Sequence, residues 1–213
     1  MFLNENELVK KLVLDLQERF DTKYIVRELR SGNNIADIVY STAIDRKNIV
    51  FEDYSNAYYY FNEIYNHKKI PRKNIKITDE SVNRKFNVFL KELECLGYIQ
   101  FDKDNIISLK NVEPVTKNFV AIEAKVSDWK SGLEQAVRYR QYANEVYVAL
   151  SSDYVKNVDR QLFRNLNVGL MSVSQDKLKI SIKAKRRSAE IIDVNYYIAD
   201  RFLKYLKIAE INL

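Results

Sequence analysis

The segment FVAIEAKV, residues 119–126, decides the fold, because it places two charged side chains inside an otherwise apolar run. Aromatic, β-branched and small apolar residues of this kind predict a buried strand near the centre of a sheet. Side chains on a strand alternate between faces, so Glu123 and Lys125 point the same way, with Cα atoms about 6.6 Å apart. Burying two charges costs several kcal/mol each unless they pair or bind a metal. This strand therefore predicts a site with a chemical role.

The segments around this strand predict an α/β fold. A helix is expected at about 128–144 and an apolar strand at 146–150, so strand, helix and strand form a βαβ unit. Further helices are expected at 5–20, 155–166 and 194–207, and further strands at 24–29, 35–40, 169–173 and 178–185. We expect a mixed central sheet flanked by helices.

A third charge, Asp37, interrupts the apolar strand IADIVY at 35–40. Two carboxylates that converge with a lysine suit a hard cation such as Mg²⁺, which prefers oxygen ligands and retains water. The lysine ammonium is then available to orient or polarise that water. Residues of these types are suited to the hydrolysis of phosphodiester bonds.

Taken in chain order, Ala36-Asp37, Ile122-Glu123-Ala124-Lys125 and the helix that follows resemble the signature of the PD-(D/E)XK nucleases, which have a restriction-endonuclease-like core. Many members carry Gln-x-x-x-Tyr on that helix, and Gln135 and Tyr139 match it on one helix face. The resemblance covers about residues 1–50 and 115–185. The chain departs from the pattern in having Ala36 where proline is usual, and in the 86 positions that separate Asp37 from Glu123.

The resemblance implies a role for each matched residue. Asp37, Glu123 and the Ala124 carbonyl would bind Mg²⁺, for which we expect Mn²⁺ to substitute, and Lys125 would assist the attacking water. Gln135 and Tyr139 would help to position the substrate. Many members also place a glutamate of the opening helix near the metal, and Glu5 lies on the apolar stripe of that helix. An acid in the first turn also interacts favourably with the helix dipole, which is the alternative interpretation of Glu5.

The 51–113 segment differs in character from the rest of the chain. It contains a tyrosine-rich helix near 53–66, a basic run at 67–76, a helix at 79–96, and short strands at 98–101 and 106–109. A two-stranded wing directly after a helix is typical of winged-helix modules, although no clear middle helix is predicted. We expect a discontinuous nuclease core, 1–50 and 114–213, with an inserted, mostly helical, winged-helix-like subdomain at 51–113.

Two basic segments are candidates for DNA contact. In the first, lysines alternate with apolar residues and no acid interrupts them; its members are Lys177, Lys179, Lys183, Lys185, Arg186 and Arg187. In the 51–113 segment the candidates are Lys73, in the basic run, and Arg84 and Lys85, on the helix before the wing. Lysines also protect exposed edge strands from aggregation, so a solvated edge is the alternative interpretation of the first segment.

Composition limits the partners and the compartment. With one cysteine and one histidine, an internal disulfide and a Cys/His zinc site are excluded. No apolar run approaches the roughly 18 residues of a membrane span, so we expect a cytoplasmic protein with no membrane partner. The net charge of +6 permits a polyanionic partner without requiring one. RNA as a substrate and a homodimeric state are both left open.

The sequence thus predicts a Mg²⁺-dependent endonuclease acting on DNA, in defence, restriction or repair. The strongest alternative is a catalytically inactive DNA-binding regulator that has the same fold and works through the 51–113 segment. Under that alternative, Glu123 and Lys125 form only a structural ion pair, and Gln135 and Tyr139 belong to a half-buried helix flank. Retention of all three charged residues favours catalysis, because neutral substitutions would relieve an inactive site of its buried charges.

Overall fold

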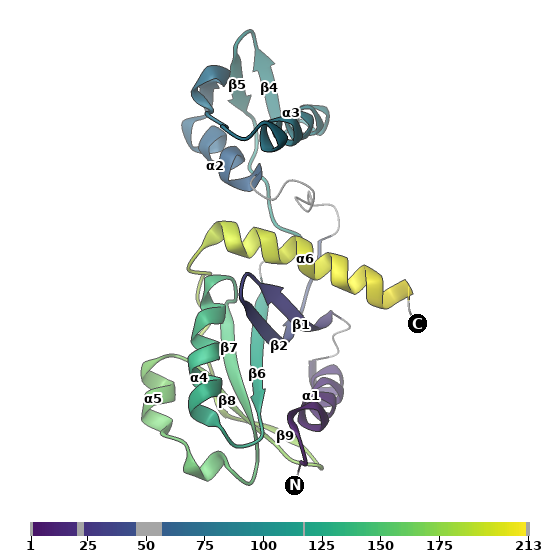
Figure 1. Cartoon of the computed structure of the whole chain (residues 1–213), viewed down its shortest axis with the longest axis vertical. Coiled ribbons are helices and arrows are strands. Elements are labelled where there is room, and N and C mark those ends of the chain that lie inside the picture. The colour runs from purple at the N-terminus through teal and green to yellow at the C-terminus, as the bar shows by residue number, and fades with distance from the viewer. Residues whose placement is uncertain (1, 21–23, 46–56, 117, 212–213) are drawn as a thin grey trace. The chain divides into compact units, whose positions relative to one another are not determined.

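A computed structural model describes residues 2–20, 24–45, 57–116 and 118–211 of the chain (Figure 1). The chain forms two compact units, one of residues 1–45 and 116–213 and the other of residues 46–115. The start of the tyrosine-rich helix expected near residue 53 lies outside the described residues. Within the described part, no helix is long and apolar enough to cross a membrane.

The first unit is built on a six-stranded sheet with the strand order β1-β2-β6-β7-β8-β9. Its strands are β1 (Ile25–Ser31), β2 (Asn34–Ser41), β6 (Phe119–Lys125), β7 (Glu145–Ser151), β8 (Gly169–Val173) and β9 (Leu178–Ile182). The three strands β6, β7 and β8 run parallel, whereas β1, β2 and β6 pair antiparallel, as do β8 and β9. Helices flank this mixed sheet, so the expected α/β class is confirmed.

Two helices pack on opposite faces of β6. Leu8, Leu12 and Leu16 of α1 (Glu5–Phe20) belong to one buried cluster with Ile122 and Ala124, the apolar face of β6. The other face, which carries Glu123 and Lys125, is covered by α4 (Trp129–Arg138). The alternation of side chains along β6 therefore separates an apolar contact with α1 from a charged contact with α4.

The closing helix α6 (Ile192–Ile211) begins two residues earlier and ends later than the expected 194–207. Its buried side chains include Phe202, whose ring meets that of Phe119 at the start of β6, with 5.2 Å between centroids. This edge-to-face contact joins α6 to the central strand.

Three expected elements differ in extent from the prediction, and polar side chains explain two of the differences. The helix expected at 155–166 is a 3₁₀ turn, η3 (Val155–Asn157), followed by α5 (Arg160–Asn165), because the Asp159 side chain accepts the Gln161 and Leu162 N–H groups as an N-cap. The expected helix at 128–144 is α4 followed by a 3₁₀ turn, η2 (Tyr139–Gln141). Asn167 bonds both main-chain groups of Lys185, so β9 ends at Ile182 instead of continuing to 185.

The second unit combines helices with a small sheet. Its elements are α2 (Ala57–His67), β3 (Lys69–Pro71), η1 (Arg72–Asn74), α3 (Glu80–Cys95), β4 (Ile99–Asp102) and β5 (Asn105–Ser108). The strand order is β3-β5-β4, with antiparallel pairing throughout. The core is apolar and includes Phe61, Ile64, Phe89, Leu93 and Ile106. The strand β3 lies inside the basic run at 67–76 and was not predicted, because three residues are too few to show an alternating pattern.

Gly169 gives a test of the packing between β7 and β8. It pairs with Tyr147, and a Cβ atom at this position would lie 2.1 Å from the Tyr147 ring. We expect Gly169→Ala to lower the free energy of unfolding by about 1–3 kcal/mol, as measured by urea unfolding. The same substitution made in a Tyr147→Leu background is expected to be less damaging, because the ring is gone. Equal losses in both backgrounds would contradict this account of the packing.

Candidate functional site

Asp37 lies where two central strands stop pairing. The antiparallel ladder between β2 and β6 runs from Ser41–Phe119 to Ile38–Ile122, so Asp37 and Glu123 are the next residues in register. The Asp37 Oδ2 atom accepts a hydrogen bond from the Ala124 N–H, at 2.7 Å. This side chain thus takes the place of a ladder partner for a buried main-chain donor. The ladder therefore ends where the Asp37 carboxylate bonds the Ala124 N–H.

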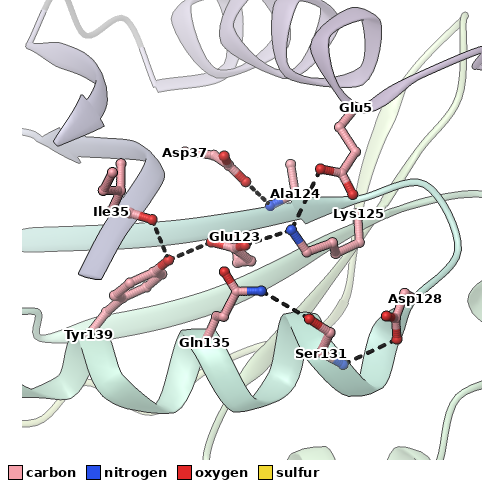
Figure 2. A network of polar contacts seen from close by, with 10 residues as sticks. All are labelled: Glu5, Ile35, Asp37, Glu123, Ala124, Lys125, Asp128, Ser131, Gln135 and Tyr139. Atoms are coloured by element: carbon pink, nitrogen blue, oxygen red, sulfur yellow. Dashed lines mark hydrogen bonds and ion pairs between the residues drawn. The ribbon is translucent and has the colours of Figure 1, made fainter. Parts of the chain in front are cut away.

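Glu123 is almost completely buried and has a partner on each carboxylate oxygen. Its side chain is 2% exposed; Oε1 lies 2.8 Å from Lys125 Nζ, and Oε2 lies 2.5 Å from the Tyr139 hydroxyl (Figure 2). The same hydroxyl lies 2.7 Å from the Ile35 carbonyl oxygen. A single hydroxyl hydrogen cannot serve both acceptors at once, so a proton on Glu123 would complete the set.

Lys125 is the positive centre of the site. Its side chain is 14% exposed, and Nζ lies 3.5 Å from Glu5 Oε2 in addition to its contact with Glu123. Burial alone would lower the pKa of Lys125, but the hydrogen bond and charge of Glu123, with the charges of Glu5 and Asp37, outweigh it and raise the pKa above its ordinary value. Lys125 is therefore an ammonium at neutral pH, a hydrogen-bond donor and not a base.

The two carboxylic acids are shifted toward their neutral forms. Desolvation by burial raises the pKa of Glu123, and the neighbouring charge of Asp37 adds to it, against the hydrogen bonds from Lys125 and Tyr139. Burial likewise raises the pKa of Asp37, although the Ala124 N–H and Lys125 oppose this effect. Acids that disfavour their own ionisation in a shared site are common at functional sites, where a bound cation or a reacting group relieves the repulsion.

The helix α4 packs closely against β6 and forms one side of the site. Asp128 caps this helix by accepting the Ser131 N–H at 3.2 Å. A Cβ atom at Gly132 would lie 3.0 Å from Lys125 Cγ, so the absence of a side chain here lets the helix press against the lysine stem. Because α4 lies this close to β6, the Tyr139 hydroxyl at the C-terminal end of α4 can bond Glu123.

The two residues of the expected Gln-x-x-x-Tyr element have different surroundings. Tyr139 is buried and bonded to Glu123, as described above. Gln135 is half-buried on the same side of α4 (Figure 2), and its amide nitrogen donates to the Ser131 hydroxyl at 3.0 Å. Among the described residues, no hydrogen bond joins Gln135 to Glu123 or Lys125. The structure therefore brings Tyr139, but not the Gln135 amide, into contact with the charged group.

A pocket of about 460 Å³ adjoins the site, and the sequence did not predict its lining. It lies against Asp37 and Glu5, with Lys10 on α1 and Arg27 and Glu28 on β1. Glu28 has a φ of +53° and falls opposite Asp37, where a rung of the β1–β2 ladder is missing. The charge of Glu28 contributes to the raised pKa of Asp37. Positive φ at a residue other than glycine is uncommon and clusters at functional sites.

The first basic segment is exposed but is only partly a strand. Lys179 lies in β9 and Lys177 just before it, whereas Lys183, Lys185, Arg186 and Arg187 follow the end of that strand. Within the described part, no ion pair joins these side chains to the acids of the site; the Arg186 guanidinium, for example, donates to Asn118 instead. In the second unit, Arg84 and Lys85 are exposed on α3, and Lys73 is exposed in η1.

The donor atoms at the site suit a hard divalent cation. Among the described residues, no three side chains of His, Cys, Asp and Glu form a metal-binding group by themselves. The oxygen donors of the site are the Asp37 and Glu123 carboxylates, with Asp37 bonded to the Ala124 N–H, and Glu5 lies across Lys125. Three carboxylates and one ammonium carry a net formal charge of −2 when ionised, which a divalent cation would balance.

Comparison with known proteins does not identify a function for the chain. No protein family and no curated protein matches the sequence. A solved structure of a protein of unknown function from Silicibacter pomeroyi aligns over 44% of this chain, with 12% identity and a TM-score of 0.35. The aligned part spans 61% of that protein's chain, which is less than two thirds of its length.

The raised pKa values of Asp37 and Glu123 predict how stability changes with pH in the absence of divalent cations. The folded chain keeps the protons of these acids to a higher pH than the unfolded chain, so the free energy of unfolding falls as pH rises above their ordinary values of 3.8 and 4.5. A pKa that differs by one between the folded and unfolded chains changes this free energy by about 1.4 kcal/mol. In Asp37→Asn the fall is expected to be smaller, because one acid and its repulsion of Glu123 are removed while the side-chain oxygen can still accept the Ala124 N–H.

Urea unfolding at pH 5 and pH 8 with EDTA measures this difference. Asp176→Asn is the matched control, because Asp176 is an exposed acid in the turn before β9. A fall in Asp37→Asn as steep as in the wild type would contradict the desolvated state of Asp37.

Proposed function

We propose that the chain is a metal-dependent endonuclease that hydrolyses DNA phosphodiester bonds, with Asp37, Glu123 and Lys125 at its reacting centre. The observation that carries the proposal is the buried Glu123, paired with Lys125 at 2.8 Å and next in register to Asp37 where β2 and β6 stop pairing. Buried charge of this kind costs stability, so its presence favours a chemical use over a purely structural one.

The arrangement of elements supports the proposal of a restriction-endonuclease-like core. A helix, a hairpin, the strand with Glu123 and Lys125, a helix and a parallel strand follow one another in the first unit, in the order that the PD-(D/E)XK resemblance implies. The helices α1 and α4 pack on opposite faces of the strand with the charged residues.

Each residue of the site has a distinct proposed role. A bound Mg²⁺, or Mn²⁺ in its place, supplies a Lewis acid that stabilises negative charge on the phosphate and lowers the pKa of water. Asp37, Glu123 and the Ala124 carbonyl would hold it. Lys125 stays protonated at neutral pH, so it donates hydrogen bonds that orient the attacking water or the phosphate oxygens.

The neighbours of these residues act by positioning them. Tyr139 fixes the Glu123 carboxylate through its hydroxyl. Gln135, on the same side of α4, is a proposed substrate contact. Glu5 stays a proposed further metal ligand. Its carboxylate also lies 3.5 Å from Lys125 Nζ, so a second proposed role of Glu5 is to position the ammonium.

DNA is the proposed substrate in part because we interpret the second unit as a winged-helix-like module. The order helix, strand, turn, helix and two strands, with the sheet β3-β5-β4, supports this interpretation, in which the 3₁₀ turn η1 would take the place of the middle helix. Arg84 and Lys85 are exposed on α3, the helix before the wing. Lys73 and the exposed cations of segment 177–187 are further proposed contacts with phosphates. Restriction, defence and repair would all use such an activity, and RNA cleavage and a homodimer stay open.

The exposed cations of α3 also favour a second candidate function, a DNA-binding regulator that does not cut. A winged helix can bind a duplex without any contribution from a nuclease core. The two candidates differ in one respect: only the nuclease requires Glu123 and Lys125 for activity.

Cleavage assays separate the two candidates. With supercoiled, linear and branched DNA and either Mg²⁺ or Mn²⁺, we expect metal-dependent cutting that falls about 100-fold or more in Glu123→Gln and in Lys125→Met. Lys130→Met is the matched control, because Lys130 is an exposed lysine of α4 that lies over the Trp129 ring. Wild-type protein that binds DNA but cuts none of these substrates, with either metal, would favour the regulator.

The role of α3 is tested by binding measurements with EDTA in the Glu123→Gln background, in which we expect cleavage to be about 100-fold slower or more. Arg84→Gln with Lys85→Gln is expected to weaken duplex binding and to reduce the slope of log K against log salt by about 1 for each phosphate that the variant no longer neutralises. Lys156→Gln, an exposed lysine of the first unit, is the control. An unchanged affinity and salt slope in the double variant would remove α3 from the proposed DNA contact.

A further inference from the structure

A groove of about 820 Å³ in the second unit has no role in the proposed cleavage chemistry, and of its lining only Lys73 is a proposed contact with the substrate. It lies between α3 and the segment that leads from η1 to it, and the turn between β4 and β5 borders it. Its volume is within the range of sites for small molecules and cofactors, about 300–1,000 Å³. The lining combines cations, amide side chains and apolar groups, so its chemistry restricts what it can bind.

One wall of the groove is a fixed chain of polar groups. The Arg72 guanidinium donates to Asn87 Oδ1 at 2.5 Å, and Asn87 Nδ2 donates to Asn83 Oδ1 at 3.2 Å. Arg72 also lies over the Phe101 ring, 5.9 Å from its centroid. These contacts hold the guanidinium and both amides in place before any ligand binds, which lowers the entropic cost of binding.

The remaining lining gives the groove a positive balance and small apolar surfaces. Arg72 and Lys73 contribute two positive charges, against one negative charge from Asp104. Ile75 and Ile77 are half-buried at its side. Such a site can hold a planar, partly apolar group together with an anion.

The burial of the groove floor argues against a hydrophobic partner. Phe86 and Leu90 line the groove but are only 4% and 1% exposed, so little apolar surface is available to an amphipathic helix. An acidic peptide would use the two cations but not the Asn83 amide nitrogen, which donates no hydrogen bond among the described residues. Amide side chains present a donor and an acceptor together, which is the pattern that the edge of a nucleobase requires.

We propose that this groove binds a single nucleotide unit, with the phosphate near Arg72 and Lys73 and the base edge read by the Asn83 amide and the second N–H of Asn87. The unit comes either from an unpaired position in a DNA strand or from a free mononucleotide. Both present the same chemistry, an anionic phosphate next to a planar base with hydrogen-bonding edges. This function is independent of cleavage at Glu123 and differs from duplex contact through the exposed face of α3.

The test uses the full chain in the Glu123→Gln background and two kinds of probe. Fluorescence anisotropy measures the affinity for a labelled single-stranded DNA heptamer, and calorimetry measures the affinity for each of the four deoxynucleoside monophosphates. We expect Asn83→Ala and Arg72→Gln each to weaken binding of the responsible probe about tenfold. Asn83 is exposed and its substitution leaves the core of the unit intact. Asn66→Ala, an exposed asparagine of α2 outside the groove, is the matched control and should bind like the parent.

The outcome identifies the source of the nucleotide. Weaker binding of the heptamer alone points to an unpaired position in a strand, and weaker binding of a monophosphate points to a free nucleotide; either result supports the proposal. The side-chain amide signals of Asn83 and Asn87 should shift in ¹H–¹⁵N spectra on addition of the same probe. If neither probe binds, or if Asn83→Ala and Arg72→Gln bind as tightly as the control, the groove is not a nucleotide site. That result would leave the cleavage proposal untouched, because no step of the test requires cutting.

Discussion

The placement of the buried Glu123 and the half-buried Asp37 beside the Lys125 ammonium is the constraint on which the first unit depends. Glu123 and Asp37 lie next to one another in register on adjacent strands. Lys125 lies two residues after Glu123 on β6, so the two side chains share one face of the strand. In a low-dielectric environment the attraction between Lys125 and these acids is strong, but it does not cancel two negative charges. Desolvation by burial raises the pKa of both acids, and the charge of Asp37 adds to this effect on Glu123. The divalent cation proposed above would balance the negative charge of the ionised carboxylates.

The fold confines the energetic cost of burying charged groups to one face of the strand β6. The strand β6 is buried on both faces, and its apolar face packs against α1 while the charged face meets α4. Gly132 permits the close approach of α4, and Tyr139 at the end of this helix bonds the buried acid. On the other side, β2 leaves the ladder at Ile38, so the Asp37 carboxylate serves the Ala124 N–H and stays beside an open pocket. The site therefore combines a buried carboxylate, Glu123, with a carboxylate that borders a pocket, Asp37.

Much of this arrangement could be predicted from alternation along single strands and helices. The shared face of Glu123 and Lys125, the strand around Asp37 and the βαβ unit all follow from local patterns, and the α/β class with a mixed sheet is confirmed. Features that depend on contacts between distant segments could not be predicted. Asn167 ends β9 by bonding Lys185, and Glu28 falls opposite Asp37 only because the β1–β2 register places it there. In the second unit, β3 is too short to give a pattern, and the groove beside α3 exists only in the folded chain.

Binding of Mn²⁺ measures the central claim most directly, because it reports on the carboxylates without requiring a substrate. Electron paramagnetic resonance detects free Mn²⁺, whose signal falls when the ion binds to protein. We predict saturable binding to the wild-type chain that weakens more than about tenfold in Asp37→Asn and in Glu123→Gln, while Asp176→Asn, in an exposed turn, binds like the wild type. A wild-type chain that binds no Mn²⁺, or variants of Asp37 and Glu123 that bind it equally well, would contradict the account of this site as a metal centre.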